Sequence, residues 1–293
     1  MAITLLMWGS LPVQLKILIA RIDPVTLTWY RFTGALLLLG IVAGRSCLSD
    51  LRQGWSRRTW ILLLVCGLGL TLNYLTYLRG LDYLTPSTAQ ILMQIVPFMV
   101  LGGGILIFGE PFAKRQWWGV LFLFIGSVLF FNQKLDQIFT AESLLFGIGF
   151  IFVSACSWTA FLLSQKALLP VLRSRTIMIC CYITGFLILG PQATVETITQ
   201  LETLFVVLVV STSLIAVAGY LMFATALRHV PTTTGGLTIA NIPLVTLFFM
   251  LLFGGTVEHL AAENLNTTAL LGAVVVVGGT VLGALGPSKK ETK

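Results

Sequence analysis

Residues 86–109 read PSTAQILMQIVPFMVLGGGILIFG, a run of 24 residues that contains no charged side chain. At about 1.5 Å per residue, an α-helix of this length extends for about 36 Å, enough to cross the roughly 30 Å hydrocarbon core of a bilayer. The run begins after Thr85 with Pro86 and ends at Gly109, residue types that favour the start and the end of a helix. The sequence therefore predicts a membrane-spanning helix here.

Similar runs occur along the whole chain. They lie at approximately 1–20, 25–44, 59–78, 86–109, 116–132, 144–165, 176–191, 204–226, 232–254 and 268–286. Of the 293 residues 57% are hydrophobic and only 10% are charged, whereas soluble domains are about 25% charged. The connections are short, so the predicted fold class is an all-α integral membrane protein of ten transmembrane helices.

The charged residues predict how these helices are oriented. The net charge is +7, but the basic residues lie in short clusters between the apolar runs, without the basic face of a nucleic-acid-binding protein. With the amino terminus in the cytoplasm, thirteen basic residues fall in cytoplasmic segments and only Arg21, Arg79 and Lys134 fall outside. Positive loops stay in the cytoplasm, so we expect both termini on the cytoplasmic side of a cell inner membrane.

The chain repeats itself at a spacing of about 150 residues. The matched positions are Trp8 with Trp158, Lys16 with Lys166, Tyr74 with Tyr220, Pro97 with Pro243, Gly119 with Gly272 and Gly126 with Gly279. Each copy holds five predicted helices, and an odd number inverts the second copy relative to the first. We assign the repeats to residues 1–132 and 144–286, and a cytoplasmic tail to 287–293. Only seven residues precede Trp8, so the first helix is expected to lack its first turns.

Several motifs give the sequence a family resemblance. In chain order they are Trp8-Gly9-Ser10, Lys16, Asp23-Pro24, Arg31-Phe32, Phe108-Gly109-Glu110, Trp118-Gly119 and Gly126. In this order and spacing they resemble the EamA-type branch of the drug/metabolite transporter (DMT) superfamily, over essentially the whole chain. The second copy departs from the pattern, because Gly254-Gly255 stands where the first has Gly109-Glu110. The resemblance implies ten helices, cytoplasmic termini and, frequently, export of amino acids or other metabolites.

The inverted repeat and the resemblance together predict which helices line a pathway. We expect a central cavity between the two halves, with the helices at 116–132 and 268–286 at the periphery. The matched glycines of these two helices predict a smooth packing seam.

Uncharged amides near prolines are the first candidates for a solute site. Gln90 and Gln94 lie four residues apart on one face of the fourth predicted helix. Nearby Pro97 lacks an N–H group and so frees a backbone carbonyl. In the second half, Asn241 precedes Pro243 by two residues. These amides either line a cavity or hydrogen-bond neighbouring helices, and the sequence leaves both interpretations open.

A second set of candidates would supply aromatic walls and polar groups to a solute. They are Trp8 and Gln14 on the first predicted helix, Asn73, Tyr74 and Tyr77 on the third, Trp158 on the sixth and Tyr220 on the eighth. Trp8 and Trp158 occur at equivalent depths, and Pro12 lets the first helix bend, so the two rings are candidates for closing the pathway. Packing within the bundle is the alternative for each.

Charged residues within the helices are few. Lys16 and Arg31 could bind a carboxylate or a phosphate, Arg31 in a bidentate way. The favoured interpretation is that both side chains reach the outer headgroups, or that Arg31 caps backbone carbonyls. Glu110 lies four residues before Lys114 and is expected to pair with it. No Asp or Glu lies in the middle of a predicted helix, so a carboxylate proton relay is not expected.

The expected function is secondary transport, most simply export of a small organic metabolite such as an amino acid. An enzyme is disfavoured because both histidines lie at helix ends and no nucleophile has an evident base nearby. A non-transporting membrane sensor or scaffold with the same fold is the alternative. The expected partners are a small solute and membrane lipid, in a monomer or homodimer. The five cysteines show no CxxC spacing, and no metal or cofactor is expected.

Overall fold

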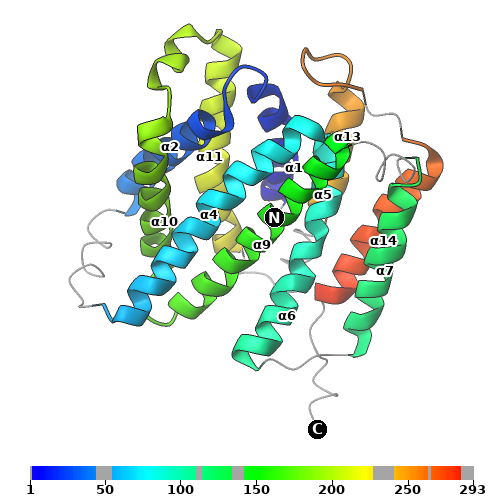
Figure 1. The fold of residues 1–293 in the computed structure, drawn as a ribbon, viewed down its shortest axis with the longest axis horizontal. Coiled ribbons are helices and arrows are strands. Elements are labelled where there is room, and N and C mark those ends of the chain that lie inside the picture. Colours follow the sequence, from blue (N-terminus) through cyan, green and yellow to red (C-terminus); the bar gives the residue numbers. More distant parts are fainter. Residues whose placement is uncertain are drawn as a thin grey trace.

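The computed structural model describes residues 2–43, 55–109, 114–133, 142–226, 241–262 and 265–284. Within these ranges the chain forms helices joined by turns and irregular segments, and no β-strand occurs there. The all-α class predicted from the sequence is therefore confirmed. Figure 1 shows the helices gathered into one bundle in which segments far apart in the sequence lie side by side.

The helices follow the predicted apolar runs. In the first half they are α1 (Ala2–Leu18), α2 (Pro24–Ala43), α4 (Arg57–Tyr83), α5 (Pro86–Leu92), α6 (Val96–Phe108) and α7 (Lys114–Phe130). In the second half they are α9 (Glu142–Leu168), α10 (Ser174–Leu189), α11 (Thr203–Ala226), α13 (Ile242–Phe253) and α14 (Thr267–Ala284). Short 3-10 segments are η1 (Met93–Ile95), η2 (Gly190–Gln192) and η3 (Val195–Gln200). The start of the predicted ninth run, 232–240, and the tail, 287–293, lie outside the described residues.

Four of the described helical runs are long and apolar enough to cross a membrane. They are Arg57–Tyr83, Pro86–Phe108, Glu142–Leu168 and Ser174–Gln192. The first and the third have 27 residues each, more than the 59–78 and 144–165 predicted from hydropathy. Some other apolar helices are shorter, such as α1 with 17 residues and α13 with 12.

Local sequence accounts for several helix ends. Asp23 Oδ1 accepts hydrogen bonds of 3.0 Å from two backbone N–H groups in the first turn of α2. Thr85 does the same for α5, where its hydroxyl oxygen accepts from the N–H of Thr88 at 3.4 Å. Such side chains satisfy N–H groups that have no partner within the helix. Gly109 ends α6 with a φ of 65°, a left-handed conformation that glycine adopts without strain.

The predicted helix over 86–109 is broken in its middle. α5 ends at Leu92, η1 makes a tighter turn, and α6 starts at Val96 with Pro97 in its first turn. Because proline has no N–H group, the carbonyl of Met93 loses its usual partner four residues on. The sequence predicts that proline frees this carbonyl for another partner, and the N–H of Val96 donates to it. The 3-10 turn thus satisfies the carbonyl that proline leaves.

The long helices α4 and α9 pack against each other through small residues and one polar pair (Figure 1). A side chain added at Gly69 would come within 2.9 Å of the Ser157 carbonyl oxygen, so glycine allows the backbones to approach closely. One turn further on, the Asn73 amide donates to the Ser154 carbonyl oxygen at 3.1 Å and to its hydroxyl at 2.8 Å. The Ser154 hydroxyl donates back to the Asn73 carbonyl oxygen at 3.2 Å.

A second close pair, α7 and α14, lies at one edge of the bundle in Figure 1. Their contact is the glycine seam, formed by Gly119 and Gly126 of α7 and Gly272, Gly279 and Gly283 of α14. A Cβ at Gly119 or at Gly126 would lie 2.6 Å from a backbone nitrogen of α14. The repeated glycines predicted a packing seam, and the structure shows that the glycines of α7 lie against those of α14.

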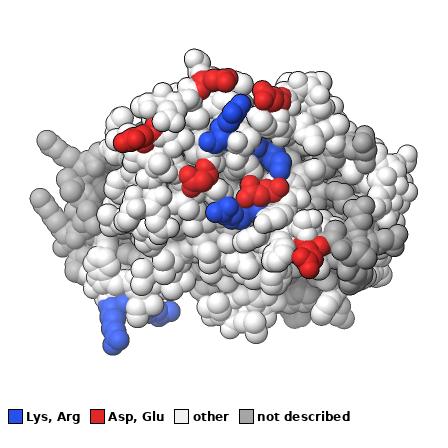
Figure 2. Space-filling view, turned by 45° about the horizontal axis from the view of Figure 1, so that its top comes forward, with Lys and Arg blue, Asp and Glu red and all other residues white. Residues whose placement is uncertain are grey.

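Charged side chains favour the ends of the bundle. The end that holds the turns before α2 and after α4 carries the ion pairs Arg21–Glu258, at 3.9 Å, and Arg79–Asp82, at 3.7 Å. Figure 2 shows the acidic side chains gathered on this face, and we call it the acidic face. Near the other end of α9, the Lys166 ammonium lies 4.8 Å from the centre of the Phe108 ring.

Gly279 and its neighbour Gly278 provide a matched test of the seam. A Cβ at Gly279 would meet the backbone of Leu123 at 2.7 Å and that of Gly119 at 2.8 Å, whereas one at Gly278 meets nothing within 4 Å. We expect Gly279→Ala to lower the free energy of unfolding by about 1–3 kcal/mol through overpacking. Gly278→Ala should change it by no more than about 0.5 kcal/mol. Thermal unfolding in detergent measures both, and equal effects would contradict the close approach.

Candidate functional site

Three helices bring a polar cluster together beneath the acidic face. Arg31 lies seven residues into α2, Tyr77 six residues before the end of α4, and Gln90 four residues into α5. At about 1.5 Å per residue, these positions lie about 6–10 Å below the same end of the bundle. We call Arg31, Tyr74, Tyr77 and Gln90 the Arg31 cluster.

The cluster contains a buried cation with incomplete compensation. Only 3% of Arg31 is exposed, and its guanidinium carbon lies 4.3 Å from the centre of the Tyr74 ring. Among the described residues the ion pairs use Arg21, Arg79 and His259, and the Arg31 Nε has no hydrogen-bond partner. Contact with an aromatic ring stabilises a desolvated cation by about 2 kcal/mol, whereas burying an ion costs several kcal/mol even after relaxation. The aromatic contact alone therefore does not offset the burial.

This placement corrects the favoured interpretation of Arg31. Its side chain is buried among helices instead of extending to the surface of the bundle, and its Nε donates to no carbonyl of the described residues. The reason is the position of α2, which packs against α4, α10 and α11 and so turns this residue toward other helices. Depth along a helix can be estimated from the sequence, but the direction in which a side chain points cannot.

The Tyr77 hydroxyl adds a second donor to the cluster. It lies close to the Gln90 side chain and within electrostatic reach of Arg31. The hydroxyl is buried, yet it makes no well-aligned hydrogen bond with the described residues. Guanidinium and hydroxyl both present hydrogen-bond donors, and Gln90 supplies one amide oxygen as acceptor. The Arg31 cluster therefore has more donors than acceptors.

Lys16 is placed differently from Arg31. Its ammonium donates to the carbonyl oxygen of Leu81, in the last turn of α4, where carbonyls have no partner within the helix. A cation is also favoured there by the helix dipole. Lys16 therefore joins α1 to α4 instead of reaching the headgroups, because a nearer acceptor is available.

Two candidates on α4 take part in packing. The Asn73 amide is occupied by Ser154 of α9, as described above. Tyr74 is buried against Phe32, with ring centroids 5.0 Å apart, while Arg31 covers its face. The alternative that the sequence gives for Asn73 is packing within the bundle, and its hydrogen bonds to Ser154 place it in a contact between α4 and α9.

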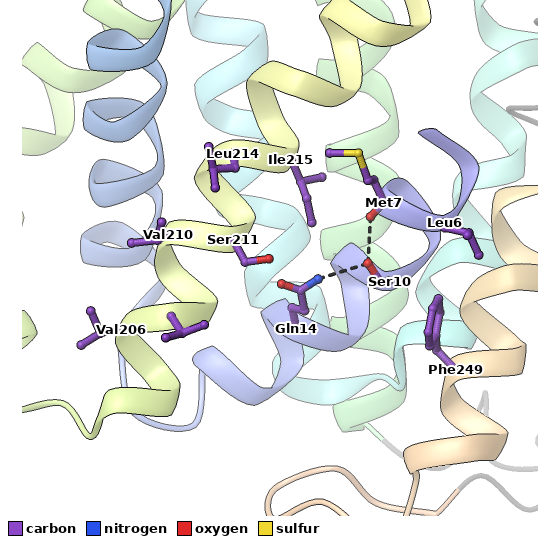
Figure 3. A pocket seen from close by; sticks show the side chains of 11 residues that line it. Leu6, Met7, Ser10, Gln14, Val206, Val210, Ser211, Leu214, Ile215 and Phe249 are labelled. Carbon is purple, nitrogen blue, oxygen red and sulfur yellow. Dashed lines mark hydrogen bonds between the residues drawn. The ribbon is translucent and has the colours of Figure 1, made fainter. Parts of the chain in front are cut away.

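A groove of about 650 Å³ lies between α1, α11 and α13. Figure 3 shows Ser10 and Gln14 of α1 and Ser211 of α11 beside it, among apolar side chains. The Gln14 amide nitrogen donates to the Ser10 hydroxyl at 3.1 Å, while its oxygen is buried without a hydrogen-bond partner. The sequence singles out Gln14 but misses both serines, although the four-residue spacing of Ser10 and Gln14 on one helix face is a usable signal.

The amide candidates near prolines lie at helix starts. Gln94 is buried within η1, just ahead of Pro97 in the first turn of α6. Asn241 stands immediately before α13, with Pro243 buried in the first turn of that helix. Both halves therefore place an amide next to a proline that begins a helix.

The two tryptophan candidates have different surroundings. Trp8 lies against Gly219 of α11, whereas Trp158 stacks on Phe161 of its own helix with ring centroids 4.9 Å apart. Pro12 is buried within α1. Two candidates are not described by the structure, namely Glu110 and the side chain of Tyr220.

Comparison with known proteins shows what this chain is related to. Residues 1–132 match the EamA-like transporter family. A Haemophilus influenzae protein named "Uncharacterized transporter" is 32% identical, over 97% of this chain and 93% of its own length. The chain belongs to the EamA-like transporter family. The "Uncharacterized inner membrane transporter YhbE" of Escherichia coli is also 32% identical to this EamA-like chain, over 97% of it and 89% of the relative.

A solved structure shares the fold. It aligns with a TM-score of 0.66 at 17% identity, covering 95% of this chain and 93% of its own. At that identity the likeness concerns the fold alone. The resemblance to the EamA branch is confirmed, and the family is one of transporters.

The Asn73–Ser154 contact can be tested by a double-mutant cycle. We expect Asn73→Ala and Ser154→Ala each to lower the free energy of unfolding by roughly 0.6–2 kcal/mol. The double variant should lose less than the sum, because both changes remove the hydrogen bond from the Asn73 amide to the Ser154 hydroxyl.

Ser157→Ala is the matched control for this cycle. The Ser157 hydroxyl donates within its own helix, to the Val153 carbonyl oxygen, so its effect should add to that of Asn73→Ala. Unfolding in detergent is the measurement. Additive losses for Asn73→Ala and Ser154→Ala would contradict the pairing.

Proposed function

We propose that this EamA-like protein is a secondary carrier that moves a small organic metabolite across the inner membrane, most simply as an exporter. The transporter family and the name of the Escherichia coli relative support the class and the location. The observation that carries the proposal is that the contacts between helices occur in equivalent pairs. A two-fold rotation that relates the two repeats would exchange the two contacts of each pair.

The pairs follow when α1, α2, α4 and α7 are matched to α9, α10, α11 and α14. The contact of α4 with α9 then corresponds to that of α11 with α1, and the contact of α4 with α10 corresponds to that of α11 with α2. The contact of α7 with α14 is equivalent to itself, because the rotation exchanges these two helices. This pattern supports ten spans in two inverted five-helix repeats, residues 1–132 and 144–286, related by an axis in the membrane plane.

One pair of equivalent contacts differs between the halves. Asn73 and Gly69 hold α4 tightly against α9, whereas the groove with Gln14 lies between α1 and α11. Alternating access requires one such interface to open as its counterpart closes. The difference therefore supports a carrier with one side closed more than it supports a rigid scaffold.

Reporter fusions test the topology. A fusion after residue 50 follows two predicted spans and should report the cytoplasm, and one after residue 137 follows five and should report the opposite side. The readouts are a fluorescent reporter active in the cytoplasm and a phosphatase active outside. Both fusions on one side would overturn the inverted repeat.

Flux measurements test the site. We expect Gln94→Ala and Asn241→Ala to reduce transport more than Glu110→Gln. Leaving a solute group unpaired in a dry cavity costs about 1–3 kcal/mol, which corresponds to roughly a fivefold to 150-fold loss. Glu110, beside Lys114 at the expected membrane edge, should contribute only about 0–1 kcal/mol.

The assay is flux into proteoliposomes at matched protein amounts, with solutes first chosen by thermal stabilisation of the purified protein. Normal flux in both amide variants with loss in Glu110→Gln would place the site at the cytoplasmic edge instead. Solute binding without flux in the wild type would favour the sensor alternative.

A further inference from the structure

We propose that the Arg31 cluster binds a carboxylate group of the transported solute, so that the solute is an organic monocarboxylate. This inference rests on the carrier function proposed above and names the chemistry of its substrate. It starts from a cation that the described chain buries without a counter-charge.

The first step is the missing counter-charge. Arg31 is 3% exposed, and an ionisable residue at this depth in a membrane protein usually serves a substrate or ion pathway. The nearest acidic residues along the chain are engaged elsewhere, because Asp82 pairs with Arg79 and Asp23 accepts from the first turn of α2. Among the described residues no carboxylate pairs with Arg31, and a ligand that carries a carboxylate would supply the negative charge that these residues do not.

The second step is the match between the donors and a carboxylate. The Nε of Arg31 and the hydroxyl of Tyr77 are both buried and make no well-aligned hydrogen bond with the described residues. A carboxylate has two oxygens that accept several hydrogen bonds and suits the planar guanidinium. The neighbouring Gln90 amide can donate as well.

The third step is the choice of a single negative charge. The other basic side chains within described helices near this end are engaged, because Lys16 donates to the Leu81 carbonyl oxygen and Arg79 pairs with Asp82. A phosphate monoester carries up to two charges and would meet only one free cation in the cluster. A monocarboxylate balances Arg31 alone.

The fourth step compares the halves of the proposed repeat. Arg31 in α2 and Cys181 in α10 each lie seven residues after the first residue of their helix. Cys181 is fully buried, so the bundle accommodates a small neutral side chain at the equivalent place. Packing of the equivalent helix therefore does not require a guanidinium, and binding of a carboxylate gives Arg31 a role.

The test uses purified full-length protein in dodecyl maltoside and thermal unfolding. The probes are matched pairs: lactate and lactamide, benzoate and benzamide, and phenylalanine and phenylalaninamide. We expect at least one carboxylate to raise the Tm of the wild type while its amide does not. Arg31→Gln should abolish the shift, and Arg31→Lys, which keeps the charge but not the planar fork, should weaken apparent binding at least about tenfold.

Two further variants make the test specific. Tyr77→Phe removes only the hydroxyl and should weaken binding several-fold without loss of the ring. Arg79→Gln is the matched control, because Arg79 lies on the same helix, half-exposed and paired with Asp82, and its loss should leave binding unchanged. If Arg31→Gln does not fold, Arg31→Lys and Tyr77→Phe carry the test.

A lipid headgroup is the other source of an anion. The unfolding is repeated in nanodiscs of neutral phosphatidylcholine and of anionic phosphatidylglycerol. Stabilisation by the anionic lipid alone, lost in Arg31→Gln, would overturn the solute assignment. So would equal stabilisation by a carboxylate and its amide, a shift that survives in Arg31→Gln, or no shift with any carboxylate.

The outcomes also separate this inference from the carrier function. Flux of a neutral or cationic solute by the wild type, with no effect of carboxylates, would remove the carboxylate assignment and leave the carrier. Arg31-dependent binding of a carboxylate without flux in proteoliposomes would remove the carrier and leave the binding site.

Discussion

The hydrocarbon core of a bilayer offers no water to a polar group, and this constraint governs the structure. α-Helices satisfy the hydrogen-bonding groups of the backbone. Where the fourth predicted span breaks, an N–H group of a 3-10 turn donates to the carbonyl that proline leaves without a partner. Polar side chains follow the same rule, since Asn73 bonds to Ser154 and Lys16 bonds to Leu81. Arg31 is buried without an equivalent partner in the described chain, and departures from such a rule concentrate at functional sites.

Helices in lipid gain little from burying apolar side chains against one another, so close backbone contact becomes important. Gly69 brings α4 and α9 together, and glycines on both helices do the same for α7 and α14. The contact of α1 with α11 includes a groove instead. The bundle thus combines two tight interfaces with a looser one, which is the distribution expected where one part of a protein has to move against another.

Much of the fold could be predicted because its signals are local. Apolar runs, Asp23, Thr85 and Gly109 fix where the helices are, and the repeated glycines indicate the seam. The hydrogen-bond partners could not be predicted, because Asn73 and Ser154 are 81 residues apart and lie on helices whose rotation is set by packing. Arg31 was misjudged for the same reason, since the sequence gives its depth but not the three helices around it.

The glycine seam also restricts how α7 and α14 can be displaced. Glycines on one helix lie against the backbone of the other, as Gly126 does against Val276. A shift by one residue, about 1.5 Å along the helix axis, would bring side chains such as that of Phe122 toward backbone atoms that now face hydrogen. Close backbone contact along the seam therefore opposes sliding of α7 against α14.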